Sequence, residues 1–224
     1  MNDQYIRNIP AISKESQLLL NKKKVLVVGC GGLGGYIIEN LLRIGVGEIT
    51  AVDGDVFQPS NLNRQLLSTQ PKLGYPKAQA AFDRAKEINP EVTFHARNLF
   101  LTEENADHLV CGQDLVIDAL DNIHSRLILE NACAKADIPL IHGAICGWQA
   151  QICTVMPGSN LLHMLYENCP ESTDKSALVF APALCAAVQS AEAVKLLCGR
   201  SGDLVGKLCV IDLQYMDWNI ITLR

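Results

Sequence analysis

The sequence contains few charged and few aromatic residues, and neither sign of charge dominates it. Of 224 residues, 19% are charged and 5% are aromatic, and the formal net charge is −5. Proteins that bind the phosphate backbone of nucleic acids need a basic surface, so nucleic acid is not expected as a partner. The 49% apolar content predicts a packed core within one substantial domain.

A run of apolar residues long enough to span a membrane is also missing. The longest run covers 177–188, whereas a bilayer span needs about 20 residues. Gln189, Glu192 and Lys195 follow it at helical spacing, as on a half-exposed helix. Residues 1–12 show no apolar stretch flanked by positive charge, so no secretory signal is visible. These observations predict a cytoplasmic protein without a membrane-spanning segment.

The nine cysteines include no C-x-x-C pair. Several of them lie inside apolar runs, as Cys153 and Cys209 do, which is typical of small core residues in a reduced protein. Neither a disulfide framework nor a zinc-ligand spacing is present, and we expect no zinc site.

Strand-like and helix-like segments alternate over the first two thirds of the chain, which favours a parallel sheet with crossover helices. Strands are predicted over 24–29, 48–53, 92–97, 114–120 and 139–142, and helices over 35–45, 76–88, from Thr102 onward and over 123–136. The pattern then changes to strands over 149–156, 208–213 and 218–223, a helix over 183–197 and an exposed polar loop over 170–176. The predicted fold class is α/β: a Rossmann-like, mostly parallel sheet with helices on both faces, extended by C-terminal antiparallel strands.

A glycine-rich loop follows the first predicted strand. Gly29, Gly31, Gly32 and Gly34 stand between that strand and a helix, and Asp53 ends the next strand about 20 residues further on. Such a loop brings backbone N–H groups and a helix N-terminus close to phosphates, and the aspartate binds ribose hydroxyls. Glycines that only pack a helix on a strand, and an aspartate that only caps a turn, are the alternatives.

A second group of polar residues lies downstream, where a nicotinamide or flavin would have no use for it. Asn61, Arg64 and Gln65 occupy a polar loop, and Lys77 begins a helix. The arginine fork and the lysine charge suit phosphates, and the amides add neutral donors. Asp55 either shapes the same pocket or holds the turn at Gly54. The alternative for the two cations is a solvated surface position.

Asp118 and Asp121 flank the end of the predicted strand over 114–120. Ligands bind at the carboxyl edge of open parallel sheets, so a carboxylate there could hold magnesium on a polyphosphate. Asp121 next to Asn122 could instead begin a helix, and Asp118 could cap a turn.

Taken together, these motifs make the chain resemble the ThiF/MoeB/HesA family, the bacterial relatives of ubiquitin-activating enzymes. The similarity runs from Tyr5 to about Leu197. The matching motifs are Tyr5-Ile6-Arg7, the glycine loop, Asp53-Gly54-Asp55, Ser60 to Gln65, Gly74 to Ala78, Ile88-Asn89-Pro90, Asp118 to Asn122 and Ala191 to Leu197.

The resemblance implies an ATP-dependent adenylyltransferase. In this family the C-terminal glycine carboxylate of a small ubiquitin-like sulfur carrier, ending in Gly-Gly, attacks the α-phosphorus of ATP to form an acyl-adenylate. By the same resemblance Asp53 would hold the ribose, and Asn61, Arg64 and Lys77 would hold the phosphates. Asp121 would bind Mg²⁺. The pathway would be thiamin, molybdopterin or related sulfur metabolism.

The resemblance also implies a division of the chain and an assembly. The whole chain, 1–224, would be one adenylation domain, with an N-terminal helical arm over 1–22, a nucleotide-binding core over 23–145 and a carrier-binding and dimer half over 146–224. Arg7 matches an arginine that reaches the triphosphate of the neighbouring subunit, so the enzyme would be a homodimer.

The chain departs from the family pattern at the cysteines. Many members carry two C-x-x-C pairs that bind zinc, and here only Cys169 stands where the first pair belongs. The following crossover loop, which in relatives often carries a carrier-bonding cysteine, is short. Cys169 is therefore either a residual nucleophile or an unreactive surface thiol, and Cys185 is predicted to be a core residue.

Three other functions remain open on the sequence alone. The enzyme could adenylate a different carboxylate, as the tRNA-nucleoside dehydratase relatives do. It could be an NAD-dependent oxidoreductase, although Arg64, Lys77 and Asp121 would then have no role. It could also be a non-catalytic relative that retains the nucleotide pocket.

Overall fold

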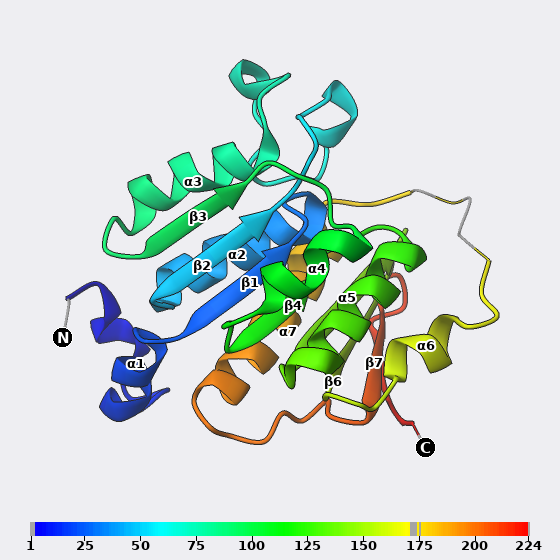
Figure 1. Cartoon of the computed structure of the whole chain (residues 1–224). Helices are drawn as coiled ribbons and strands as arrows, with labels where there is room; N and C mark the ends of the chain where they lie inside the picture. The colour runs from blue at the N-terminus through cyan, green and yellow to red at the C-terminus, as the bar shows by residue number, and fades with distance from the viewer. Residues whose placement is uncertain (1–2, 171–173, 175, 224) are drawn as a thin grey trace.

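The central feature of the fold is one mixed sheet with the strand order β3-β2-β1-β4-β5-β6-β7-β8. The computed structural model (Figure 1) describes residues 3–170, 174 and 176–223. The strands are β1 (Lys24–Val28), β2 (Glu48–Val52), β3 (Thr93–Arg97), β4 (Leu115–Asp118), β5 (Leu140–Cys146), β6 (Gln149–Val155), β7 (Lys207–Asp212) and β8 (Asp217–Thr222). β1 to β5 run parallel, and β6, β7 and β8 pair antiparallel. The predicted fold class is therefore confirmed.

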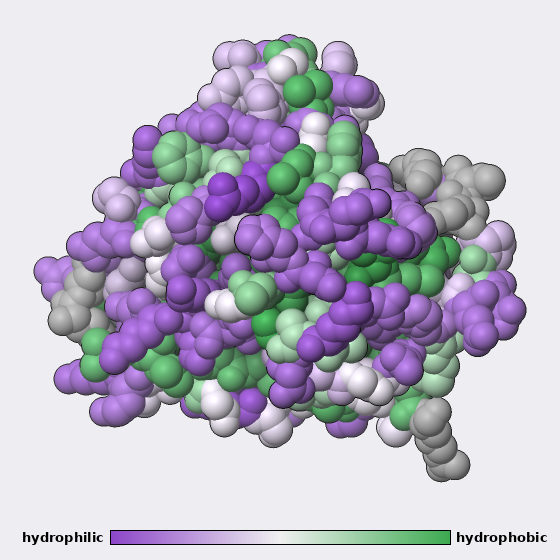
Figure 2. Space-filling model, in the orientation of Figure 1, coloured by the Kyte–Doolittle hydropathy of each residue, from purple (hydrophilic) through white to green (hydrophobic). Residues whose placement is uncertain are grey.

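Helices cover both faces of the sheet. They are α1 (Lys14–Leu20), α2 (Gly32–Ile44), α3 (Lys77–Ile88), α4 (Glu103–Val110), α5 (Ile123–Ala136), α6 (Leu161–Tyr166) and α7 (Phe180–Leu197), with short 3₁₀ helices η1 (Asp3–Asn8), η2 (Pro59–Asn61) and η3 (Gln70–Lys72). One apolar core lies between the sheet and α2, α3 and α7, and a second lies under α4, α5 and α6. Figure 2 shows the face of the molecule formed by α4, α5 and α6, where hydrophilic side chains cover most of the surface.

Helix α7 is long and apolar enough to cross a membrane when judged by length and composition alone. It lies against α2, β5 and β6, and Ala181, Cys185 and Ala186 on it are fully buried. Its composition is explained by packing, since it serves as the central core helix behind the C-terminal half of the sheet.

Several element ends differ from the sequence prediction, and one helix was missed. α2 begins at Gly32, inside the glycine loop, and not at residue 35. β5 extends to Cys146, beyond the predicted end at residue 142, because it pairs along its whole length with β6 in a hairpin. α6 was not predicted; Glu130 of α5 accepts hydrogen bonds from the backbone N–H groups of Leu162 and His163 at its start. The predicted loop over 170–176 lies partly outside the described residues.

The parallel strands end together at the edge where the functional residues were predicted. Val28 of β1 is paired with Val52 of β2 on one side and with Asp118 of β4 on the other. Because β2 and β4 flank β1, the crossover helices that follow β1 and β4 lie on opposite faces of the sheet, α2 on one and α5 on the other. An open α/β sheet has a crevice at such a switch point, and ligands bind there.

Candidate functional site

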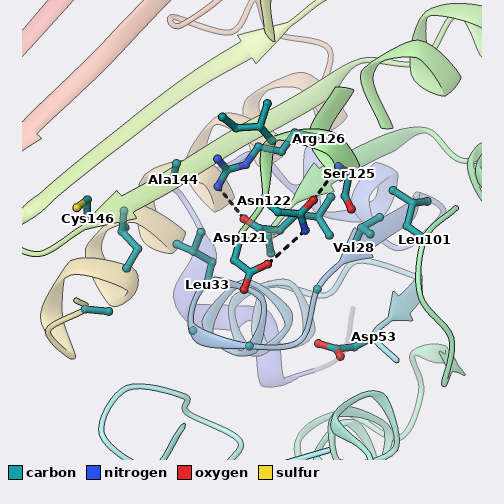
Figure 3. A pocket seen from close by; sticks show the side chains of 18 of the residues that line it. Val28, Leu33, Asp53, Leu101, Asp121, Asn122, Ser125, Arg126, Ala144 and Cys146 are labelled. Atoms are coloured by element: carbon teal, nitrogen blue, oxygen red, sulfur yellow. Dashed lines mark hydrogen bonds between the residues drawn. The ribbon is translucent and has the colours of Figure 1, made fainter. Parts of the chain in front are cut away.

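A cavity of about 540 Å³ lies at this switch point. Its walls come from the loops after β1, β2 and β4, from the start of α5, and from β5, β6 and α6. Figure 3 shows Asp121, Asn122 and Arg126 gathered at the start of α5, with Asp53 to one side of them and Cys146 to the other. The volume is in the range of small-molecule binding sites.

The glycines of the loop have two different roles. Gly29 adopts a φ of +100°, and a Cβ on Gly34 would lie 1.8 Å from the carbonyl oxygen of Gly29. Gly29, Gly31 and Gly32 line the cavity, whereas Gly34 does not, so Gly34 is required for packing the helix on the strand. The loop thus delivers the N-terminus of α2 to the cavity, as an anion site requires.

Asp53 lines the cavity and is held by the loop that it faces. Its Oδ2 accepts a hydrogen bond from the N–H of Cys30 at 2.7 Å, and its Oδ1 accepts one from the N–H of Asp55 at 2.8 Å. Burial raises the pKa of Asp53, and the two backbone hydrogen bonds oppose that rise. Each oxygen keeps acceptor capacity for ribose hydroxyls, which fits the predicted role.

Lys77 and Asp55 form an ion pair at the cavity wall, with 3.0 Å between Nζ and Oδ2. The lysine side chain is 9% exposed, whereas that of Asp55 is 57% exposed. Lys77 is therefore a buried cation whose ion-pair partner, Asp55, lies on its open side, a position from which a phosphate could take over as partner.

The polar loop after β2 contributes two of its three predicted residues. Arg64 lines the cavity, and its guanidinium donates to the carbonyl oxygen of Ser60 and to the side chain of Asn63. Gln65 lines it as well, and its Oε1 has no hydrogen-bond partner within the part of the chain described. Asn61 does not reach the cavity, because its side-chain oxygen accepts from the N–H of Gln58 and stabilises η2.

The two aspartates after β4 have separate roles. Asp118 is fully buried; its Oδ1 accepts from the N–H of Leu120, and its Oδ2 lies 2.6 Å from Nδ1 of His142. It therefore caps a turn and cannot serve as an open metal ligand. Asp121 is exposed and lines the cavity, while Asn122 is the N-cap of α5.

A magnesium ion fits the donors at this position. Mg²⁺ commonly binds proteins through one or two carboxylates, with phosphates and waters as its other ligands. Asp121 supplies one carboxylate at the cavity wall, so most of the coordination would come from the polyphosphate. Among the described residues, no group of three or more His, Cys, Asp or Glu side chains could hold a metal ion.

Sequence reasoning missed Arg126, His142 and Tyr166. The Arg126 and Tyr166 side chains line the cavity, with the guanidinium 5.5 Å from the ring centroid, and His142 lies directly behind Tyr166. Arg126 could have been found, since it lies one helical turn beyond Asn122 at the same sheet edge. His142 and Tyr166 carry no such signal, because 24 residues separate them.

Arg7 lies at the opposite end of the strands from the cavity. It is exposed on η1, and that segment is anchored by Tyr5, which packs on Gly45 and accepts a 2.6 Å hydrogen bond from Asn89. Gly45 ends α2 just before the start of β2. Arg7 therefore does not line the cavity of its own subunit.

The cysteines divide into buried and exposed sets. Cys185 is fully buried, and burial raises the pKa of its thiol, in agreement with the predicted core role. Cys169 is exposed at the cavity and donates to the carbonyl oxygen of Leu165. Cys146, at the end of β5, also lines the cavity.

Comparison with known proteins places this geometry in a family. A protein-family model with the description "ThiF family" matches residues 4–224 of this chain. The chain is 34% identical to the SAMP-activating enzyme E1 of Haloferax volcanii, covering 99% of this chain and 85% of that protein. It is 32% identical to the sulfur carrier protein adenylyltransferase of Thermus thermophilus, covering 99% and 87%. Among solved structures, E. coli MccB with ATP shares the fold, with a TM-score of 0.85 at 21% identity over 100% of this chain and 73% of that one.

Proposed function

This chain belongs to the ThiF family, and from that premise we propose that it activates the C-terminal carboxylate of a ubiquitin-like sulfur-carrier protein with ATP. It is an adenylyltransferase, as are relatives that cover nearly all of it. The proposed carrier ends in Gly-Gly and serves thiamin, molybdopterin or related sulfur metabolism in the cytoplasm. The observation that carries the proposal is one cavity lined by the glycine loop, by the carboxylates of Asp53 and Asp121, and by three cations, Arg64, Lys77 and Arg126.

The reaction needs positioning and charge stabilisation more than acid–base chemistry. A carboxylate is already ionised at neutral pH, so no general base is required. Its oxygen attacks the α-phosphorus, the bond from that phosphorus to the bridging oxygen breaks, and pyrophosphate leaves with the electron pair. The N–H groups at the start of α2 and the side chains of Arg64 and Lys77 would bind the phosphates and stabilise the charge that develops.

The remaining predicted residues have supporting roles in this scheme. Asp53 would hold the ribose and Gln65 would donate an amide N–H to the nucleotide. Asp55 would release Lys77 to the phosphates on binding. Asp121 would hold Mg²⁺, which supplies charge neutralisation on the polyphosphate. Asn61 would act by shaping the loop that carries Arg64.

The proposal includes a homodimer in which Arg7 completes the partner's site. Arg7 lies on an exposed helix, at the opposite end of the strands from its own cavity. A second copy is the arrangement that would bring this guanidinium to a triphosphate.

Pyrophosphate exchange tests the proposal directly. With Mg²⁺ and a Gly-Gly-terminated carrier, labelled pyrophosphate should enter ATP. Lys77→Ala should reduce kcat/KM about 100-fold, as the loss of a charge-stabilising donor typically does. Arg64→Ala and Asp121→Ala should have effects of at least that size. Lys135→Ala is the matched control, because Lys135 pairs with Asp107 on the surface.

Two results would contradict the proposal. The first is NAD binding without ATP binding, which would support an oxidoreductase. The second is ATP binding without exchange in the presence of any Gly-Gly carrier encoded in the same genome, which would favour another carboxylate substrate or a non-catalytic role.

A further inference from the structure

His142 is a fully buried polar residue that the proposed reaction leaves without a role. It lies on β5, and both ring nitrogens have partners: Nδ1 is 2.6 Å from Asp118 Oδ2 and Nε2 is 2.9 Å from the hydroxyl of Tyr166. The rings of His142 and Tyr166 meet edge to face, with centroids 5.6 Å apart. The imidazole therefore joins the end of β4 to the end of α6.

The partners determine which nitrogen carries the proton. Asp118 accepts the N–H of Leu120 at Oδ1 and faces the Arg126 guanidinium at Oδ2, so it is placed as an acceptor and Nδ1 donates to it. Nε2 is then an acceptor for the Tyr166 hydroxyl proton, and the phenol oxygen in turn accepts from the side-chain amide of Gln151. The result is one directed chain from Gln151 through Tyr166 and His142 to Asp118.

The surroundings keep the imidazole of His142 and the phenol of Tyr166 uncharged. Burial lowers the pKa of His142, although Asp118 and Glu130 favour the charged ring, and burial raises the pKa of Tyr166 to about 12. Arg126 adds a further positive charge against protonation of the imidazole. Each hydrogen bond of the chain then has one donor and one acceptor at neutral pH.

This chain of hydrogen bonds also holds a cation, Arg126, at the cavity wall. The Arg126 guanidinium lies over the Tyr166 ring, donates to the carbonyl oxygen of Leu120 at 2.8 Å, and has its Nε 3.6 Å from Asp118 Oδ2. Arg126 is 8% exposed, and Nε has no hydrogen-bond partner among the described residues. Arg126 is thus held by the two residues that His142 connects.

The part of this wall formed by Tyr166 lies away from the glycine loop, Asp53 and Lys77, whereas Arg126 lies next to Asp121 at the start of α5 (Figure 3). The glycine loop, Asp53 and Lys77 form the β1–β2 end of the cavity, whereas Tyr166, Gln151 and Ala144 form the β5–β6 end. If the first end holds the ribose and phosphates, the second end is the space left for the acyl chain.

We propose that His142 is a positioning residue, which holds Tyr166 and Arg126 in place for the carboxylate end of the substrate. The inference rests on the proposed function, since the acyl chain is assigned to the end of the cavity that the nucleotide leaves. Its chemistry is specific: an acceptor at Nε2 is required, and a buried residue of similar size without one does not suffice.

Three variants separate this role from a general effect on folding. His142→Asn keeps an N–H donor near Asp118 but has no acceptor for Tyr166. His142→Gln places a carbonyl oxygen where Nε2 was and keeps that acceptor. Tyr166→Phe keeps the ring under Arg126 and removes the hydroxyl. The matched control is Cys133→Ala, a buried change on α5 outside the cavity.

The experiment measures both KM values in pyrophosphate exchange, with ATP and with the Gly-Gly carrier that supports exchange by the wild-type enzyme. Binding of AMPCPP, measured by calorimetry, reports on the nucleotide end alone. We expect His142→Asn and Tyr166→Phe to raise the carrier KM about tenfold, about 1.4 kcal/mol, and to leave the ATP KM and AMPCPP affinity within twofold. His142→Gln should recover most of the carrier KM, and Cys133→Ala should change neither.

Equal changes in both KM values, or an unchanged carrier KM, would overturn the inference while leaving the proposed function intact. ¹⁵N NMR of the imidazole provides a readout without any carrier: a ring protonated at Nε2 at neutral pH would also overturn it. If no carrier supports exchange by the wild-type enzyme, the proposed function fails, and the assignment of this wall to the acyl chain fails with it.

Discussion

Replacing Gly34 by alanine should disrupt the packing between the glycine loop and α2, although Gly34 itself does not line the cavity. A Cβ there would lie 1.8 Å from the carbonyl oxygen of Gly29, whereas ordinary contacts begin near 3.4 Å. Both groups belong to the backbone, so no side chain can rotate to relieve the clash, and α2 must move away from β1. Overpacking of this kind costs about 3 kcal/mol or more.

Gly32 offers the matched control two residues earlier on the same helix. A Cβ on Gly32 would meet its nearest neighbour, Pro182, at 3.6 Å, which is an ordinary contact. Alanine there should leave stability unchanged or raise it by about 0.5–1 kcal/mol, because glycine is a poor helix former. Gly32 lines the cavity, however, so its alanine variant should bind ATP more weakly.

Thermal unfolding and AMPCPP binding measure the two effects separately. For a domain of this length a loss of 3 kcal/mol corresponds to a fall in Tm of roughly 6–12 °C. We expect that fall for Gly34→Ala only. If Gly34→Ala melts within 2 °C of the wild-type protein and binds AMPCPP normally, the packing role assigned to Gly34 is wrong.

Two further predictions concern assembly and pH. Mixing an inactive Arg7→Ala variant with an inactive Asp121→Ala variant in equal amounts should restore about a quarter of the exchange activity. Half of the dimers formed at random are mixed, and each mixed dimer has one intact site out of two. No recovery despite proven subunit exchange would exclude a shared site. Burial raises the pKa of Glu39, but hydrogen bonds from Arg84 and Arg43 outweigh it and lower the pKa below its usual 4.5. The ion pairs therefore stabilise the fold above about pH 4.5 and lose that effect as the pH falls. Glu39→Gln should be less stable than wild type by about 1 kcal/mol at pH 7 and equally stable near pH 3, as measured by thermal unfolding; a difference that persists at the lower pH would contradict this assignment.

The sequence predicts the nucleotide half of the fold well, because its signals are local. The strand before Gly29 is a continuous apolar run, and the helix over Ile123–Ala136 has the observed bounds. The start of α2 was placed too late because consecutive glycines usually indicate a loop. Here the helix begins among them, since packing on β1 excludes any side chain at Gly34.

The C-terminal half depends on contacts that the local sequence does not contain. α6 begins after Asn160, whose φ is +51°, and its first N–H groups are satisfied by Glu130 from another helix. The same dependence on distant contacts explains which site residues the sequence analysis misassigned or missed. Asn61 was grouped with Arg64 by proximity in sequence, but its side chain caps η2. His142 was not identified because its partners come from two other elements.

The strand order has a consequence for how the protein folds. β5 and β6 form a hairpin, and β7 and β8 follow one another directly, so these pairs need only short loops to close. β1 and β4 are neighbours in the sheet, but two strands, three α-helices and two 3₁₀ helices separate them in the chain. Closing that long loop carries the larger entropic cost and depends on distant contacts, which slow folding. The nucleotide cavity lies at this junction, so we expect it to form late, and the appearance of ATP affinity during refolding should report the completed sheet.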